Sequence, residues 1–449
     1  MMPRAASGAA GPAGAAGGAP PALPISALLA GALSLLVGAV YLALDPAVLT
    51  GYLGSPRVLA TTHLLTIGFV TLVYLGTLQQ LPAVLLVTDL AWPRMGLLSL
   101  PLFVVGCVLL VSGFAVGVAP RLLASGGILL TVALGLAFSQ LLATAATRPP
   151  RDPGGRGLIT AVAYLFLTVF FGLLLAGARA SPQLATITGY PASLHQLFGL
   201  AGAFLLGIAA SGQKLLTMFA LSKGGKTWRL TALTYAIHVA MIAALARAVL
   251  PLSGGGDGFD QPLKWLALAG LASAAALQVW EVMAILRRRL RKRLEAPVLR
   301  YVASHAFLPL SGVLLLFGLP EAATASFLLG FVGLAVSGML VKILSFLTWT
   351  SVYARRGRRE QPPLLRDLVV PWLEPLITWG LALGALATSA AIAMSSEPAA
   401  VIAAGALVIG AAAQLAQVVV IVQRTLFGVR RAAPAVAPVS AGVAKGSKA

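Results

Sequence analysis

The chain has 449 residues, of which 59% are hydrophobic and 10% charged, and its formal net charge is +20. Polar side chains this scarce cannot cover a globule of this size in water. The composition therefore excludes a soluble enzyme and predicts an integral membrane protein whose main partner is the lipid bilayer. The positive charge does not indicate a nucleic-acid partner, because the basic residues are not part of a soluble domain that could bind one.

The predicted elements begin with a low-complexity tail, residues 1–24, whose Ala, Gly and Pro composition is typical of disorder. Twelve apolar runs follow, and each is long enough to cross the hydrocarbon as a helix. We expect these spans at 25–45, 58–81, 96–118, 122–146, 157–178, 193–221, 229–250, 264–286, 300–319, 322–351, 369–394 and 399–423. Residues 429–449 form a second tail, disordered and basic, so the membrane domain is predicted to occupy 25–428.

Glycines at a constant spacing divide the twelve spans into three groups of four. Gly68, Gly199 and Gly330 follow one another at intervals of 131 residues (199 − 68 and 330 − 199), each in the second span of its group. A partner glycine lies eight residues after each, at Gly76, Gly207 and Gly338. Because four crossings return the chain to its starting side, we predict an all-α fold of three parallel four-helix repeats, at about 25–146, 157–286 and 300–423.

A glutamine recurs in the last span of each group, at Gln140, Gln278 and Gln414. A polar side chain on an apolar helix either knits neighbouring helices together by hydrogen bonds or lines a pathway, and helix packing is the commoner reason.

Positive charge predicts the orientation of the spans. Lys and Arg gather in both tails and in the loops after every even-numbered span up to the tenth, including the cluster from Arg287 to Arg293 and Arg300. The opposite side has only Arg57, Arg121, Arg179, Arg247 and Lys264. This asymmetry predicts that both termini are cytoplasmic.

Four histidines are the candidate metal and cofactor ligands. His63 and His195 lie near the outer ends of the second and sixth spans, His238 near the middle of the seventh, and His305 near the inner end of the ninth. A histidine in hydrocarbon is costly enough to suggest a function, and imidazole ligates haem iron and copper. Hydrogen bonding between helices is the alternative. We expect His63 and His195, with His238 as a third candidate, to share a region of the outer half, which His305 does not reach.

The topology and two stretches of sequence resemble subunit I of the heme-copper oxidase superfamily. The stretches are His63-Leu64-Leu65-Thr66-Ile67-Gly68-Phe69 and Lys342-Ile343-Leu344-Ser345-Phe346-Leu347-Thr348-Trp349, which are similar to a divergent bacterial branch of cytochrome oxidase subunit I-like proteins. The resemblance implies a bacterial cytoplasmic membrane protein of respiratory-chain electron transport. It also implies that His63 is an axial haem ligand and that His195 and His238 are copper ligands.

Several residues that the resemblance calls for are missing. The tenth span has no histidine, where the family has two, and the seventh has one instead of an adjacent pair. A binuclear centre needs several ligands that converge on two metals. We therefore do not expect this chain alone to reduce oxygen or nitric oxide, and we expect haem rather than copper as its cofactor.

Ionisable residues inside the predicted spans leave two interpretations open. Glu281 and Glu374 lie near inner ends, where an oxidase-like protein would take up protons, but they also lie where neighbouring arginines are available as partners. Lys214 and Lys342 are expected to extend toward the inner surface.

Two functional hypotheses follow. The first is an oxidase-subunit-I-like protein that holds one haem, with His63 and His195 as ligands, for electron transfer or gas sensing with a redox partner or other oxidase-like subunits. The second is a non-enzymatic carrier, transporter or assembly protein that uses the same scaffold without a cofactor. Glycines beside the histidines suit both, because they clear a helix face for a flat macrocycle and also permit close helix packing.

Overall fold

A computed structural model of the protein describes residues 19–80, 82, 86, 88–181, 183, 191–250, 258–353 and 363–427. These residues form helices and no β-strand, and twelve helical stretches are long and apolar enough to cross a membrane. The prediction of an all-α protein with twelve spans is confirmed, and the chain is an integral membrane protein. The predicted tails lie outside the described residues, apart from residues 19–24.

The helices follow the predicted spans closely. The first group consists of α1 (Ala22–Ala43), a composite helix of α2 (Pro56–His63), η2 (Leu64–Thr71) and α3 (Leu72–Leu78), then α5 (Met95–Ala115) and α6 (Pro120–Thr147). The second consists of α7 (Pro153–Ala180), a composite of α9 (Pro191–Leu197), η3 (Phe198–Leu205) and α10 (Leu206–Phe219), then α11 (Thr227–Val249) and α12 (Asp260–Arg287).

The third group has the same order. It consists of a broken first span, α13 (Ala296–Ser304) and α14 (Phe307–Leu316), a composite of α15 (Pro320–Ala325), η5 (Ser326–Gly333) and α16 (Leu334–Val352), then α17 (Leu373–Met394) and α18 (Glu397–Phe427). Two short 3₁₀ segments, η1 (Pro46–Thr50) and η6 (Leu365–Leu368), lie in connections. Helix α1 begins at Ala22, inside the stretch predicted as tail, because Pro20 and Pro21 precede it and proline suits a helix start.

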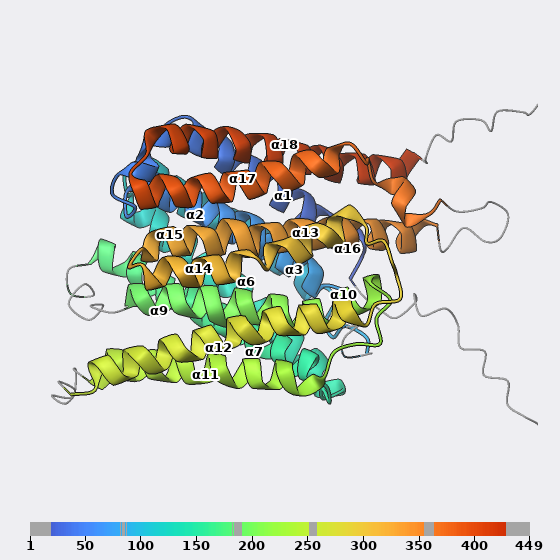
Figure 1. Cartoon of the computed structure of the whole chain (residues 1–449), viewed down its shortest axis with the longest axis horizontal. Coiled ribbons are helices and arrows are strands. Elements are labelled where there is room, and N and C mark those ends of the chain that lie inside the picture. Colours follow the sequence, from blue (N-terminus) through green and yellow to red (C-terminus); the bar gives the residue numbers. More distant parts are fainter. Residues whose placement is uncertain are drawn as a thin grey trace, which may run out of the picture.

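The three composite helices occupy the middle of the bundle. Figure 1 shows the helices running along the long axis, with α17 and α18 along one edge and α11 and α12 along the other. Of the twelve spans, the three composite helices are the most buried. The third and fourth helices of each group, α5 with α6, α11 with α12 and α17 with α18, form the most closely packed pairs.

Small residues allow this close packing. At Gly76 an added Cβ would lie 2.9 Å from the Cβ of Ala27 in α1, and at Gly410 it would lie 2.7 Å from the backbone nitrogen of Leu381 in α17. Without a hydrophobic driving force between helices in lipid, such backbone proximity is a main source of packing energy. Gly76, one of the repeated glycines, therefore serves helix packing, which is one of the two roles that the sequence left open.

A π-helical segment interrupts each of the three composite helices. These segments, η2, η3 and η5, are each eight residues long and contain Gly68, Gly199 and Gly330 respectively. In the first, the Thr71 hydroxyl donates to the carbonyl oxygen of Thr66, five residues earlier, at 2.8 Å. Such segments are rare in proteins and are frequent at functional sites. His63 directly precedes the first of them.

A buried arginine connects all four spans of the third group. Arg300 in α13 is fully buried and pairs with Glu374 in α17. Its other nitrogens donate to Ser337 Oγ at 2.9 Å, to Thr378 Oγ1 at 3.0 Å and to Gln414 Oε1 at 3.4 Å. Arg300 is therefore not one of the exposed loop charges among which the sequence placed it. Its guanidinium fork satisfies acceptors on three other helices.

We expect Arg300→Met to lower the free energy of unfolding by about 3–5 kcal/mol, because it leaves the Glu374 carboxylate buried without its partner. Unfolding in mixed micelles would measure this. The matched control is Arg366→Gln at the exposed Arg366–Asp367 pair (3.8 Å), which should change stability by less than about 1 kcal/mol. The double variant Arg300→Met with Glu374→Leu should cost less than Arg300→Met alone, and an additive loss would contradict this account.

Candidate functional site

His63 and His195 lie face to face across the first and second groups of helices. Their ring centroids are 6.3 Å apart and their planes differ by 23°. His63 comes from the end of α2 and His195 from α9. The prediction that these two histidines share a region is confirmed.

Backbone carbonyls fix the tautomer of both rings. Nδ1 of His63 is 2.7 Å from the carbonyl oxygen of Leu59, and Nδ1 of His195 is 2.8 Å from that of Thr168. A carbonyl oxygen only accepts, so each Nδ1 carries a hydrogen and each neutral ring has its lone pair on Nε2. Neither Nε2 has a hydrogen-bond partner among the described residues. Metal-binding histidines have this arrangement, in which a carbonyl orients the ring and Nε2 ligates.

An aromatic ring and an arginine lie beside the histidine pair. Phe114 of α5 stacks on His63 with centroids 5.0 Å apart, and the Arg179 guanidinium lies 6.0 Å from the centroid of Phe114. Beside the second histidine, a Cβ added at Gly172 would lie 3.0 Å from His195 Cε1. Because Gly172 has no side chain, the imidazole of His195 can pack closely against α7.

His238 has a different partner. Its Nδ1 is 2.5 Å from the hydroxyl of Tyr164, and the two ring centroids are 5.7 Å apart. Tyr164 lies one helical turn before Thr168, whose carbonyl orients His195. His238 and His195 therefore contact neighbouring turns of α7, but the structure shows no contact between the two imidazoles.

His305 has both ring nitrogens engaged. Its Nδ1 is 2.9 Å from the carbonyl oxygen of Tyr301, and its Nε2 accepts from the amide of Gln278 at 3.0 Å. The helix is interrupted at this residue, between α13 and α14. Pro309 has no N–H to donate to the carbonyl oxygen of His305, four residues earlier. His305 therefore links α12 to the α13–α14 span by a hydrogen bond, which is the alternative to metal ligation that the sequence left open.

The recurring glutamines also join helices. Besides the bond of Gln278 to His305, Gln140 accepts from Gln79 at 3.3 Å, and Gln414 accepts from Arg300 and Ser337. Each of these bonds crosses between helices, which confirms the packing interpretation over a lined pathway.

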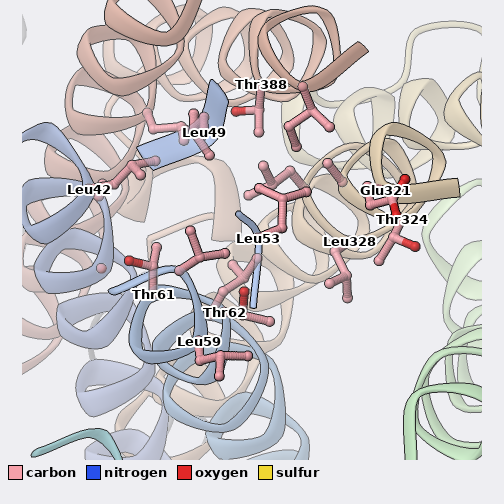
Figure 2. A pocket seen from close by; sticks show the side chains of 18 of the residues that line it. Leu42, Leu49, Leu53, Leu59, Thr61, Thr62, Glu321, Thr324, Leu328 and Thr388 are labelled. Atoms are coloured by element: carbon pink, nitrogen blue, oxygen red, sulfur yellow. The ribbon is translucent and has the colours of Figure 1, made fainter. Parts of the chain in front are cut away.

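An apolar cavity lies beside the histidine-bearing segments. It has a volume of about 340 Å³ and lies between α1, α2 and η2 of the first group and α15, η5, α17 and α18 of the third. Figure 2 shows Leu42, Leu49 and Thr61 on one side of it and Leu328 on another. The hydroxyls of Thr61, Thr324 and Thr388 bond to carbonyls of their own helices, so they add little polarity to the wall.

The cavity approaches both histidines without including them. Thr62 and Gln196, the neighbours of His63 and His195 in sequence, line it, and so does Leu59, whose carbonyl orients His63. The two features therefore share helical turns.

The intramembrane carboxylates form ion pairs with arginines. Glu281 pairs with Arg229, and its other oxygen accepts from Gln213 at 2.9 Å, while Glu374 pairs with Arg300. All four charged side chains are almost fully buried. The ion-pairing interpretation is confirmed.

Lys342 in α16 is anchored by an ion pair with Glu295. Its Nζ is 2.6 Å from Glu295 Oε2, and Arg291 Nη1 is 2.6 Å from the other carboxylate oxygen. Burial by itself would raise the pKa of Glu295, but the hydrogen bonds and charges of Lys342 and Arg291 outweigh it and hold this pKa below its ordinary value.

The sequence has no match among models of known protein families or among curated proteins. Among the described residues no group of three or more His, Cys, Asp or Glu side chains is arranged to hold a metal ion. The donor set that the structure brings together is therefore the two-imidazole pair.

Sequence reasoning missed the residues that contact His63, His195 and His238. Phe114, Thr168 and Tyr164 each contact a histidine from another helix. No local pattern marks them, because an aromatic residue or a threonine on an apolar helix looks like ordinary packing. Only the tertiary arrangement selects them.

The lowered pKa of Glu295 predicts a pH-dependent contribution to stability. Because the pKa is lower in the folded state, the contribution is fully present above the unfolded value of about 4.3 and is lost as the pH falls through the folded value. We expect Glu295→Gln to lower the melting temperature at pH 7 and the difference from the wild type to shrink below about pH 4.

Thermal unfolding in detergent at several pH values would measure this difference. Glu397→Gln is the control, because Glu397 is exposed and has no ion pair among the described residues. A Glu295→Gln effect as large at pH 3.5 as at pH 7 would contradict the assignment.

Proposed function

We propose that this protein is a divergent cytochrome oxidase subunit I-like membrane protein in which His63 and His195 together hold one haem, for electron transfer or for sensing a diatomic gas. The observation that carries the proposal is the convergence of two oriented imidazoles, 6.3 Å apart, from spans of two different groups. The two rings share no hydrogen bond with each other, so a direct bond between them does not explain the convergence.

The donor chemistry of the pair fits an iron porphyrin. Both rings are held as Nδ1–H tautomers, so His63 and His195 would hold the iron through their Nε2 lone pairs. When bound, haem iron supplies one-electron chemistry or a site for a diatomic ligand. The carbonyls of Leu59 and Thr168 would keep the imidazoles aligned, and Phe114 would shield His63 from water. Reduction of oxygen or nitric oxide by this chain alone is not part of the proposal.

Haem binding has a direct spectroscopic test. Protein purified from haem-replete cells should show a Soret band that sharpens on reduction with dithionite. His63→Ala and His195→Ala should each remove the low-spin spectrum, because each deletes one axial ligand. His305→Gln is the matched control and should keep it, because His305 is engaged by Gln278. A colourless wild-type protein would rule out the haem, and a metal analysis of the same sample would then show whether the pair holds copper.

A second candidate function, a carrier of an apolar molecule, is favoured by the cavity beside the histidines. Its volume of about 340 Å³ lies within the range of small-molecule sites, and such sites are mostly apolar. This function needs no cofactor.

The cavity predicts that an apolar molecule copurifies with the protein. Extraction with organic solvent and mass spectrometry should find it in near-stoichiometric amount. Leu328→Trp should abolish copurification by filling the cavity, whereas Leu383→Trp, on the exposed face of α17, should retain it. Equal recovery from both variants would show that the molecule is bulk lipid and would remove this candidate.

A further inference from the structure

A groove lies between the first turns of α7 and α11, on the side that the charge pattern predicts to be cytoplasmic. Its lining includes Arg151 and Arg156 from α7 and the residues that precede it, and Trp228, Ala232 and Tyr235 from α11. It is about 720 Å³ in volume and lies on the surface, away from the histidine pair and from the apolar cavity. Neither proposed function uses it.

The guanidinium groups of Arg151 and Arg156 are not paired with a carboxylate among the described residues. Both side chains are exposed, and neither has an ion pair or hydrogen bond among the described residues. The one carboxylate in the groove, Asp152, is engaged with the start of α7, where its Oδ1 accepts from the backbone nitrogen of Gly155 at 2.9 Å. The groove therefore presents two guanidinium groups to an anion.

An aromatic side chain is held rigidly beside these arginines. Trp228 packs edge-on against Trp280 with centroids 5.4 Å apart, and the Arg229 guanidinium lies 5.7 Å from the Trp228 ring. Arg229 is itself paired with Glu281, so its charge is not available to a ligand. Trp228 nevertheless remains 47% exposed, so part of the indole is accessible to a ligand.

An apolar and aromatic stripe leads from the groove toward the hydrocarbon. Trp228, Ala232 and Tyr235 follow one another at helical spacing on one face of α11, and Tyr235 is 66% exposed. Seven residues of helix span about 10 Å, so the stripe extends from the headgroup level into the acyl region. Tryptophan and tyrosine favour this interface, where one end of the side chain is wet and the other apolar.

We propose that this groove binds one anionic phospholipid of the cytoplasmic leaflet. Arg151 and Arg156 contact its phosphate, and an acyl chain lies along the Trp228–Ala232–Tyr235 stripe. Guanidinium groups bind phosphate by paired, charge-assisted hydrogen bonds, which favours phosphate as the anion. The apolar stripe beside them favours a lipid over a free anion, because a free anion would make no use of it.

The test is titration of the detergent-purified full chain with dioleoyl phosphatidylglycerol, dioleoyl phosphatidylcholine and inorganic phosphate, followed by native mass spectrometry and thermal unfolding. We expect phosphatidylglycerol to bind and stabilise the protein, and the other two to do neither at the same concentration. Stabilisation by inorganic phosphate alone would show a simple anion site and would overturn the proposal.

Paired variants separate this site from general surface charge. Arg151→Gln with Arg156→Gln should weaken phosphatidylglycerol binding about 30-fold, at about fivefold for each arginine. The control, Arg287→Gln with Arg288→Gln, removes the same charge from the exposed end of α12 and should leave the affinity unchanged. Equal losses in both double variants, or no loss in the first, would overturn the assignment.

A third variant tests the acyl stripe. Tyr235→Ser keeps both arginines but shortens the apolar surface, and it should weaken dioleoyl phosphatidylglycerol binding without affecting the folded state. Unchanged binding in this variant would show that only the headgroup is recognised, which would overturn the placement of the acyl chain.

Discussion

The lack of hydrogen-bonding solvent in the bilayer interior is the constraint on which this structure depends. Backbone amides and carbonyls must pair within each span, so every crossing is a helix. Polar side chains must likewise find partners on other helices, because an unpaired polar group in hydrocarbon is costly. Arg300, Gln140 and His305 all meet this requirement by bonding across helices. These bonds hold the spans in register.

Close packing in the centre of the bundle positions the candidate site. Small residues such as Gly76 let the composite helices approach their neighbours, and a π-helical segment starts directly after His63. A histidine on a helix that packed less closely would face lipid. Here two of them meet at 6.3 Å, and a carbonyl from a rigid helix orients each ring. The pair is therefore preorganised to ligate, and this is the physical basis for the proposed haem.

The two sides of the membrane domain have different chemistry. The predicted outer half contains the histidine pair and the apolar cavity, which share helical turns through Leu59. The predicted inner half contains the buried ion pairs, the Lys342–Glu295 pair and the groove between α7 and α11. The proposed redox or ligand chemistry at one side and the proposed attachment to anionic lipid at the other do not use the same residues.

The sequence by itself determined the class of protein, the twelve spans and the place of the glycine-bearing helices as second in each group of four. Composition and run length are enough for this, because the bilayer accepts only long apolar helices. The pairing of His63 with His195 was also predictable, since both lie at one depth in spans with equivalent positions. The tertiary structure decided the partners. Only in the tertiary structure is Arg300 buried, and only there do His238 and His305 form hydrogen bonds with Tyr164 and Gln278. The π-helical segments are also a feature of the structure alone. No local pattern in the sequence encodes these features, because they depend on the rotation of each helix about its axis and on the residues of other spans that this rotation brings near.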